Sequence, residues 1–318
     1  MICEQSNVCV LGSGIWGTAI ACAIERKFGS CVIFTKNTQT FEQINTLHTN
    51  KGAKFASSIK AELNYAKLAE YQNIVLATPS YALYDVLPVI KSLPVHIGII
   101  VATKGLDIKK QQLISTTLQD EVVNPVMILS GASFADEVIN DEFTVIDLAG
   151  QNIQHTTSIA QDLSSSRFIV LPSTNVAELQ LSGCFKNIVA ILVGMLRGLG
   201  YRDNICSSVI AKGIEQTKLL ADKMDDQNRN IILSVYSDII LTASSVKSRN
   251  MSFGMGIATN LDGPNQLTEG RLVIDALLGL AQRYGMKLPL IELASLCLQD
   301  QANLRQIIES QLHQIFSP

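Results

Sequence analysis

The sequence predicts an α/β protein in which a Rossmann-like, doubly wound sheet precedes an all-α half. Short apolar and β-branched runs, separated by helical-length segments, fill the first half of the chain. Three glycines follow the first run at the spacing of a tight strand-to-helix turn. From about Ser173 onward, apolar residues recur at helical intervals. We therefore expect two domains, 1–173 and 174–318, because single domains usually have roughly 100 to 200 residues.

The expected strands come first along the chain. Several of them are apolar without alternation, which is typical of parallel strands covered by helices on both faces. In order they are Val8–Leu11, Cys31–Phe34, Asn73–Ala77, Ile97–Ala102, Val126–Leu129, Phe143–Leu148 and Phe168–Leu171.

The helical half contains a strongly apolar segment, Ile188–Leu196, bounded by Lys186 and Arg197. This segment is shorter than the roughly 20 residues that a membrane span needs, so we expect no transmembrane helix. Polar breaks between helices are expected at Tyr201–Asn204, Asp225–Arg229 and Ser244–Ser252.

The composition favours a globular, enzyme-like chain with small ligands. Of the 318 residues, 47% are hydrophobic and 17% are charged, which is enough apolar material for a sizeable core. The net charge is −3 and the basic residues are scattered, so the sequence contains no basic cluster that would bind a nucleic-acid backbone. The cysteines form no C-x-x-C pair, so we expect buried thiols, a reducing cytoplasmic compartment and no metal centre. The N-terminus lacks a basic leader, and we expect no export.

Gly12, Gly14 and Gly17 form a G-x-G-x-x-G motif directly after an apolar strand and directly before a helical run. In a dinucleotide site the first glycine permits the turn, the second admits the pyrophosphate, and the third lets helix and strand pack closely. The helix N-terminus then offers free N–H groups to the phosphates. A glycine-rich turn without a ligand is the alternative, but the context favours NADP or NAD.

The second expected strand is followed by Thr35, Lys36 and Asn37. NAD-selective folds usually carry an acid here, against the ribose 2′-hydroxyl. Lys36 instead suits a 2′-phosphate and favours NADP, or tolerance of both cofactors. A solvated surface lysine is the alternative.

Two further strand ends carry candidate binding groups. Lys104 and Gly105 follow the Ile97 run, and the small residues Ser130–Ala135 follow the Val126 run. Open α/β sheets bind ligands at the carboxyl ends of their strands. A cation there can meet a phosphate or a carbonyl oxygen. Ordinary strand-to-helix turns are the alternative.

The helical half adds Lys186, Asp238 and the run Ser248–Asn250 as candidates. Lys186 lies in an apolar helix, where desolvation lowers the pKa of a lysine and makes it a proton donor near neutral pH. A snorkelling lysine is the alternative. Asp238 precedes an apolar helical run, and the arginine fork of Ser248–Asn250 suits a phosphate. A helix cap and a dipole partner are the alternatives.

Taken in order, these segments resemble the NAD(P)-dependent glycerol-3-phosphate dehydrogenase family from Val8 to about Pro289. The matching blocks are G-S-G-I-W-G-T-A from Gly12, A-T-K-G-L from Ala102, S-G-A-S-F-A from Ser130, L-S-G-C-F-K-N from Leu181, D-I-I-L-T from Asp238, S-R-N-M-S-F-G from Ser248 and E-G from Glu269.

The resemblance implies reversible NAD(P)H-dependent reduction of dihydroxyacetone phosphate to sn-glycerol 3-phosphate, which supplies phospholipid synthesis. It implies that Lys186 donates the proton, Lys104 polarises the carbonyl and Asp238 positions the lysine or the substrate hydroxyl. The implied substrate-binding residues are Lys104, Gly131, Ser133, Lys186, Asp238, Ser248, Arg249 and Asn250. The implied cofactor-binding residues are Gly12, Gly14, Ile15, Trp16, Gly17, Lys36, Lys104, Ala135, Arg249, Leu267 and Glu269.

Some positions depart from the family pattern. Ala132 stands where proline is usual, Asp136 where lysine is frequent, Ser237 where glycine precedes the aspartate, and Ile205 where alanine is normal. We expect these changes to affect the catalytic rate more than the reaction class. Competing interpretations are a β-hydroxyacid dehydrogenase-like reductase and a non-catalytic dinucleotide-binding regulator. We also expect a homodimer, because exposed apolar surface on the helical half suits a subunit interface.

Overall fold

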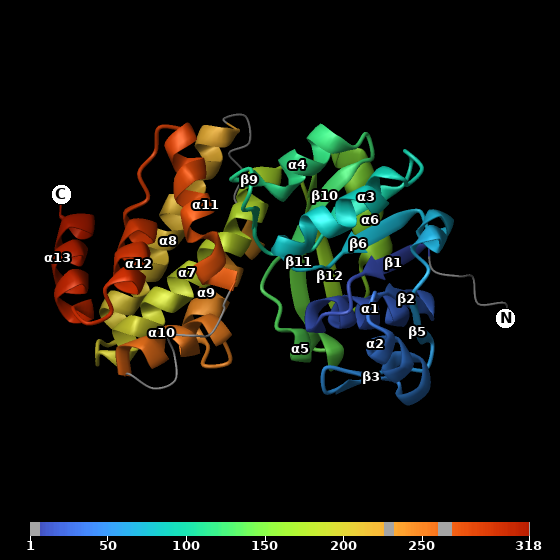
Figure 1. The fold of residues 1–318 in the computed structure, drawn as a ribbon, viewed down its shortest axis with the longest axis horizontal. Coiled ribbons are helices and arrows are strands. Elements are labelled where there is room, and N and C mark those ends of the chain that lie inside the picture. The colour runs from blue at the N-terminus through green and yellow to red at the C-terminus, as the bar shows by residue number, and fades with distance from the viewer. Residues whose placement is uncertain (1–6, 226–231, 260–268, 318) are drawn as a thin grey trace. The chain divides into compact units, whose positions relative to one another are not determined.

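The computed structural model describes residues 7–225, 232–259 and 269–317, which divide into two compact units (Figure 1). The sheet unit comprises Met1–Thr103 and Ile114–Val176. The helical unit comprises Lys104–Leu113 and Ala177–Pro318. The short segment Lys104–Leu113 therefore belongs with the helices, although it lies within the first half of the sequence.

The sheet unit is built on an eight-stranded sheet with the order β12-β11-β10-β7-β6-β1-β2-β5. Neighbouring strands pair in parallel, except that β10 and β11 are antiparallel. The strands are β1 (Val8–Leu11), β2 (Cys31–Phe34), β5 (Ile59–Glu62), β6 (Asn73–Leu76), β7 (Gly98–Val101), β10 (Val126–Ser130), β11 (Thr144–Gly150) and β12 (Phe168–Ser173).

The predicted fold class is confirmed, with differences in detail. Each expected run forms a strand close to its predicted ends, but the pattern missed the edge strand β5. The connection from β10 to β11 contains only the short helix α5 (Ala135–Ile139). A parallel pairing needs a longer crossover than this, so β11 runs back antiparallel to β10.

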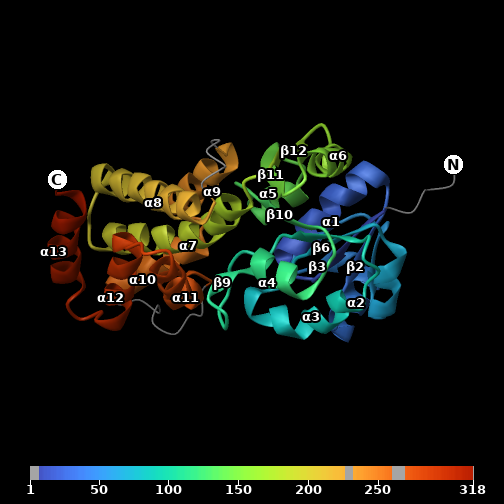
Figure 2. The same cartoon turned by 90° about the horizontal axis from the view of Figure 1, so that it is seen from above.

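Helices cover both faces of the sheet, as Figure 2 shows for α1 and α6 on one side and α3 and α4 on the other. Apolar residues of α1, α5 and α6 join those of the strands in one buried core, in which Ile20, Ile33 and Val75 are almost fully enclosed. The helices are α1 (Ile15–Phe28), α2 (Thr38–Glu42), α3 (Leu83–Lys91), α4 (Ile114–Glu121) and α6 (Ile153–Leu163). Shorter elements are η1 (Gln43–Leu47), η2 (Tyr65–Glu70), η3 (Ser80–Ala82) and the hairpin β3 (Thr49–Asn50) and β4 (Ala53–Lys54).

Helix α7 (Val176–Gly198) runs through the middle of the helical unit, with other helices around it (Figure 1). Every residue from Ala177 to Leu196 is buried. By length and composition α7 could cross a membrane, but its most apolar window is wholly buried inside the fold. The remaining helices are α8 (Asp203–Met224), α9 (Leu233–Ser244), α10 (Arg249–Thr259), α11 (Glu269–Arg283), α12 (Pro289–Gln299) and α13 (Leu304–Phe316).

Three local expectations for this half differ from the structure. The predicted apolar segment was shorter than α7, because Lys186 marked its start in the sequence yet lies buried within the helix. The predicted polar break Ser244–Ser252 ends early, since α10 begins at Arg249. Asp238 lies in the middle of α9 and not ahead of a helix, so it is no partner for a helix N-terminus.

The helical unit also contains a small hairpin of β8 (Leu106–Asp107) and β9 (Gln112–Leu113). Its turn lies against α11, where a Cβ atom added at Gly279 would lie 2.3 Å from Gln111 Oε1. The guanidinium of Arg283 donates a hydrogen bond to the carbonyl oxygen of Lys110. These contacts hold Lys104 and the hairpin that follows it within the helical unit.

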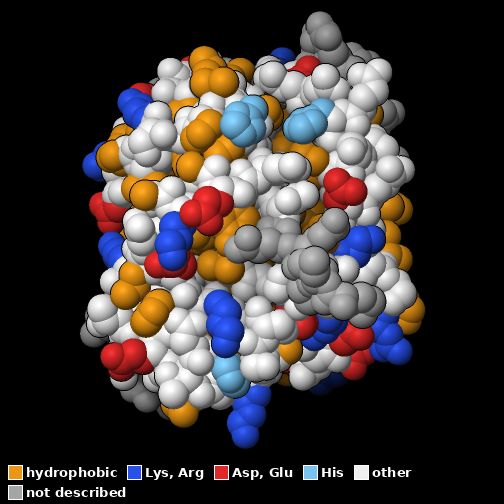
Figure 3. All heavy atoms as spheres, turned by 90° about the vertical axis from the view of Figure 1, so that its right-hand side faces the viewer, with side chains coloured by type: hydrophobic (Ala, Val, Ile, Leu, Met, Phe, Trp, Pro, Cys, Tyr) orange, Lys and Arg blue, Asp and Glu red, His pale blue; other side chains and the backbone are white. Residues whose placement is uncertain are grey.

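The described cysteines are all buried and form no disulfide, and Cys3 lies outside the described residues. Burial raises the pKa of the Cys22 thiol to about 11, so this group stays protonated near neutral pH. On the face of the molecule in Figure 3, lysines and arginines alternate with aspartates and glutamates, with small hydrophobic areas between them. Neither sign of charge predominates on that face.

Candidate functional site

The three glycines of the motif meet different surroundings in the sheet unit. Gly12 has a φ of +123°, and a Cβ atom added there would lie 2.6 Å from the carbonyl oxygen of Ala77. A Cβ atom at Gly17 would lie 2.1 Å from the carbonyl oxygen of Gly12. At Gly14 nothing lies within 4 Å of that position. The turn is therefore closed around Gly12 and Gly17 and open at Gly14, which fits a pyrophosphate approaching the backbone there.

The turn is braced by its neighbours, and its helix begins without a side-chain cap. Gly14 is the N-cap of α1 and has no side chain that could accept a hydrogen bond from the helix N–H groups. The Asn50 amide donates to the Ser13 carbonyl oxygen at 2.9 Å and to Thr18 Oγ1 at 2.8 Å. Helix α1 thus begins without a side-chain cap, in a loop whose conformation is fixed by hydrogen bonds, and a helix N-terminus of this kind suits an anion.

Other predicted binding residues of the sheet unit lie at or near the same carboxyl edge. Ile15 is partly exposed at the start of α1, and Trp16 packs against the core beside it. Gly131 follows β10 with a φ of +156°, and a Cβ atom there would lie 2.8 Å from Ile146. Ser133 donates a hydrogen bond from Oγ to the Gly131 carbonyl oxygen at 2.9 Å. Ala135 is the first residue of α5.

Lys36 follows the carboxyl end of β2 with a side chain that is 79% exposed. Its ammonium lies 3.4 Å from Asp85 Oδ2 on α3. The preceding residue, Thr35, is buried, and its hydroxyl lies 2.8 Å from the hydroxyl of Ser13 in the glycine turn. The loop that carries Lys36 is therefore tied to the turn that carries Gly12 and Gly14.

In the helical unit, the predicted catalytic residues lie together. Lys186 Nζ on α7 donates a hydrogen bond to Asp238 Oδ1 on α9 at 2.6 Å. The two side chains are 6% and 1% exposed. Lys104 lies beside them: a Cβ atom added at Gly183, one turn before Lys186, would lie 3.8 Å from Lys104 Cβ.

The environment of Lys186 shifts its proton affinity. Burial and the neighbouring charge of Lys104 lower the pKa of Lys186 while Asp238 raises it, and the net result is a pKa of about 7. A lysine with this pKa exchanges a proton close to neutral pH. The second carboxylate oxygen of Asp238 is buried and has no hydrogen-bond partner among the described residues. It remains able to accept a hydrogen bond from a hydroxyl group.

Two residues at this cluster were not singled out from the sequence. Thr242, one turn after Asp238 on α9, donates from Oγ1 to Asp238 Oδ1 at 3.5 Å. Asn187, which follows Lys186, accepts a hydrogen bond from the Asn250 amide at 2.9 Å. The only sequence signal for Thr242 is its i+4 spacing from Asp238, and that for Asn187 is its adjacency to Lys186.

Helix α10 begins at the predicted phosphate-binding run. Ser248 is buried and accepts a hydrogen bond on Oγ from the N–H of Met251 at 3.3 Å, as a helix cap does. Arg249 is the first residue of the helix and is exposed. Asn250 accepts a hydrogen bond from the Gly270 N–H at 3.4 Å, so its amide joins α7, α10 and α11. Leu267 lies outside the described residues, and of Glu269 only the backbone at the start of α11 is described.

Comparison with known families decides the identity. A family model described as NAD-dependent glycerol-3-phosphate dehydrogenase N-terminus matches residues 7–156, and its C-terminus counterpart matches residues 175–309. The chain belongs to the NAD-dependent glycerol-3-phosphate dehydrogenase family. Membership makes it an oxidoreductase that uses NAD or NADP.

Other members of the glycerol-3-phosphate dehydrogenase family align with almost the whole of this chain. The glycerol-3-phosphate dehydrogenase [NAD(P)+] of Orientia tsutsugamushi is 28% identical over 97% of this chain and 98% of its own length. That of Haemophilus influenzae is 30% identical over 92% of each chain. The crystal structure of glycerol-3-phosphate dehydrogenase from Coxiella burnetii is 25% identical, with a TM-score of 0.85 over 96% of this chain and 98% of its own. Fold and family therefore agree.

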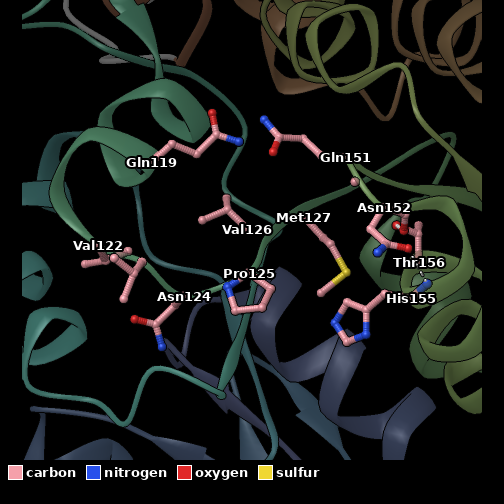
Figure 4. A pocket seen from close by; sticks show the side chains of 12 residues that line it. Gln119, Val122, Asn124, Pro125, Val126, Met127, Gln151, Asn152, His155 and Thr156 are labelled. Atoms are coloured by element: carbon pink, nitrogen blue, oxygen red, sulfur yellow. Dashed lines mark hydrogen bonds between the residues drawn. The ribbon is translucent and has the colours of Figure 1, made fainter.

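A separate cavity of about 380 Å³ lies at the opposite, amino-terminal edge of the sheet, around the start of β10. Figure 4 shows the amide ends of Gln119 and Gln151 pointing toward one another there, with His155 near Met127. None of the residues that line this cavity is a lysine, arginine, aspartate or glutamate. It thus lacks the lysine and arginine side chains that a phosphorylated substrate needs.

Proposed function

We propose that this chain reduces dihydroxyacetone phosphate to sn-glycerol 3-phosphate reversibly with NADPH or NADH, and that Lys186 supplies the proton. The observation that carries the assignment is the buried Lys186–Asp238 pair with Lys104 beside it. A carbonyl that accepts a hydride develops negative charge on oxygen. The two lysine ammonium groups can stabilise this negative charge, and one of them can also donate a proton to the oxygen.

The dinucleotide, when bound, supplies the hydride. The glycine turn fits this cofactor, because only Gly14 is open to an approaching pyrophosphate. We assign cofactor contacts in the sheet unit to Gly12, Gly14, Ile15, Trp16, Gly17, Lys36 and Ala135, and in the helical unit to Lys104 and Arg249. The resemblance to the family adds Leu267 and Glu269; Leu267 and the side chain of Glu269 lie outside the described part of the chain.

The lysine cluster divides the chemical work. Asp238 holds the Lys186 ammonium by the 2.6 Å hydrogen bond, which fixes the direction from which the proton leaves. The charge of Lys104 lowers the pKa of Lys186, and we assign to Lys104 the polarisation of the substrate carbonyl oxygen. The unpartnered Oδ2 of Asp238 can accept a hydrogen bond from the substrate hydroxyl. In the reverse direction the neutral Lys186 amine takes the hydroxyl proton.

The substrate phosphate needs a separate anchor. The N-terminus of α10, with Arg249 in first place and Ser248 as cap, offers a guanidinium fork and helix N–H groups to a dianion. Asn250, Gly131 and Ser133 complete the proposed substrate contacts. Anchoring the phosphate orients the carbonyl, so that remote binding assists the chemical step.

Initial rates of NADH and NADPH oxidation with dihydroxyacetone phosphate test this function. Lys186→Met should abolish turnover, although the protein that remains folded should still bind the dinucleotide. Lys223→Met, which changes an exposed lysine on α8, should be fully active. Tight dinucleotide binding by the wild type without turnover would favour the regulator. Turnover of a keto acid in place of dihydroxyacetone phosphate would favour the β-hydroxyacid dehydrogenase-like reductase.

We further propose that the protein works in the cytoplasm as a homodimer. The cysteines that the structure describes are buried and form no disulfide, which supports a reducing compartment. The exposed side chains of Leu233 and Ile240 on α9 and of Leu219 on α8 support an apolar interface on the helical unit. A monomer mass from light scattering at micromolar concentration would contradict the dimer.

A further inference from the structure

The Lys36–Asp85 pair connects two parts of the sheet unit that flank the glycine turn. In the sheet, β2 and β6 lie on either side of β1. Lys36 follows β2, and Asp85 belongs to α3, the helix after β6. Their 3.4 Å contact therefore joins the loop after β2 to the helix after β6, the two strands that flank β1.

The adenosine ribose of a dinucleotide binds at this position in such a fold. Its 2′ substituent meets the residues at the carboxyl end of the second strand, which carry an acid for NAD or a cation for NADP. Here the residues after β2 include a cation but no acid. The hydrogen bond between Ser13 and Thr35 fixes Lys36 close to the phosphate-binding turn.

The structure supplies the missing acid from another element. Asp85 lies within ion-pair distance of Lys36, and its side chain is 66% exposed, so it can meet a ligand at the same place. Its carboxylate can accept hydrogen bonds from the 2′- and 3′-hydroxyls of NADH. The same carboxylate repels the 2′-phosphate of NADPH and competes with it for Lys36.

We propose that Asp85 is a specificity-determining residue that turns this enzyme toward NADH in spite of Lys36. This inference rests on the proposed function, since it concerns the cofactor of the same reaction. Lys36 alone would favour NADPH. Because Asp85 already neutralises the charge of Lys36, the attraction between Lys36 and the 2′-phosphate of NADPH contributes less to binding.

The size of the effect follows from the exposure of both groups. Exposed charges interact through water and are screened by salt, so the Asp85 charge should change NADPH affinity about three- to tenfold and not by orders of magnitude. The effect should shrink when the salt concentration is raised. A structural disturbance of α3 would not depend on salt in this way.

Dissociation constants of NADH and NADPH for the full-length protein test the proposal, with quenching of Trp16, the single tryptophan, as signal. Asp85→Asn should tighten NADPH binding about three- to tenfold at low salt and leave NADH binding equal or weaker. Lys36→Gln should weaken NADPH binding and affect NADH little. Asp162→Asn is the matched control, because it removes the same charge from an exposed residue of α6, a helix that packs against β12 at the other edge of the sheet.

The outcomes separate this proposal from the function on which it rests. An unchanged NADPH-to-NADH ratio in Asp85→Asn, or the same change in Asp162→Asn, overturns the role of Asp85 while leaving the dehydrogenase intact. Failure of the wild type to bind either dinucleotide overturns both. The role of Asp85 is supported if the relative affinity shifts toward NADPH in Asp85→Asn but not in Asp162→Asn, and if this shift becomes smaller at high salt.

Discussion

Lys186 Nζ and Asp238 Oδ1 lie 2.6 Å apart, joining the centre of α7 to the centre of α9 in the buried part of the helical unit. Each charge offsets part of the free-energy cost of burying the other, because a single unpaired charge in the interior strongly destabilises the folded protein. The pair is therefore a structural constraint on the helical unit, in addition to the catalytic role that we propose for it.

Removing only one member of this pair should be more harmful to folding than removing both. Lys186→Met leaves the Asp238 carboxylate buried without its partner, and we expect a loss of about 3–5 kcal/mol in the free energy of unfolding. Lys186→Met combined with Asp238→Leu should recover most of that loss. Urea unfolding followed by circular dichroism measures both. A single variant as stable as the wild type would contradict this account.

The pH dependence of the reaction should follow the charges around Lys186. Its pKa of about 7 means that the ammonium needed for reduction is lost as the pH rises above neutrality, so kcat/KM for reduction should fall there. The reverse oxidation needs the neutral amine and should rise over the same range.

Two variants should move that pH profile in opposite directions. Lys104 lowers the pKa of Lys186, so Lys104→Met should shift the decline of the residual reduction to higher pH. Asp238 raises the pKa, so Asp238→Asn should shift it to lower pH. Shifts between variants are the measured quantity, because the substrate phosphate contributes equally to each profile. Shifts of the same sign in both variants would refute the assignment.

The glycines of the turn should respond differently to a single methyl group. Gly17→Ala places its Cβ atom 2.1 Å from a backbone oxygen, so the sheet unit should unfold at lower temperature, by several degrees. Gly14→Ala meets no protein atom within 4 Å and should fold normally. It should nevertheless weaken dinucleotide binding at least about tenfold, since it occupies the approach of the pyrophosphate. Calorimetry measures the melting temperature of each variant, and fluorescence titration measures its affinity for the dinucleotide. An equal decrease in melting temperature for Gly17→Ala and Gly14→Ala would argue against open space at Gly14.

Arg249 should act on substrate binding and not on folding, because it is exposed at the start of α10. Arg249→Met should raise the KM for dihydroxyacetone phosphate about 10- to 100-fold, the range expected for loss of a charge-assisted hydrogen bond. Arg202→Met, which removes an exposed guanidinium just before α8, is the control and should leave KM unchanged. A KM unaffected in Arg249→Met would place the phosphate elsewhere.

The parts that could be predicted from sequence are those set by local spacing. The glycine turn needs only Val8–Leu11 before it and α1 after it, and apolar runs identify strands buried between helices. Long-range pairings have no such signal. Lys186 and Asp238 are 52 positions apart, and Lys36 and Asp85 are 49 apart. Their contacts arise from the packing of α7 on α9 and from the order of β2, β1 and β6.

The length of α7 was underestimated for the same reason. A lysine in an apolar run normally indicates the end of a buried segment, and only the distant carboxylate of Asp238 makes its burial tolerable. The antiparallel direction of β11 also depends on how the chain returns from β10, which the residues of β11 do not encode.

The assignment of Lys104–Leu113 to the helical unit means that the chain passes from one unit to the other three times, at 103/104, 113/114 and 176/177. A gene split after residue 176 would therefore leave Lys104 on one polypeptide and Lys186 with Asp238 on the other. During synthesis the ribosome delivers Lys104 more than seventy residues ahead of α7, so this segment must wait for its partners. We therefore expect this segment to reach its final position only after α11, against which the β8–β9 hairpin packs, has been synthesised.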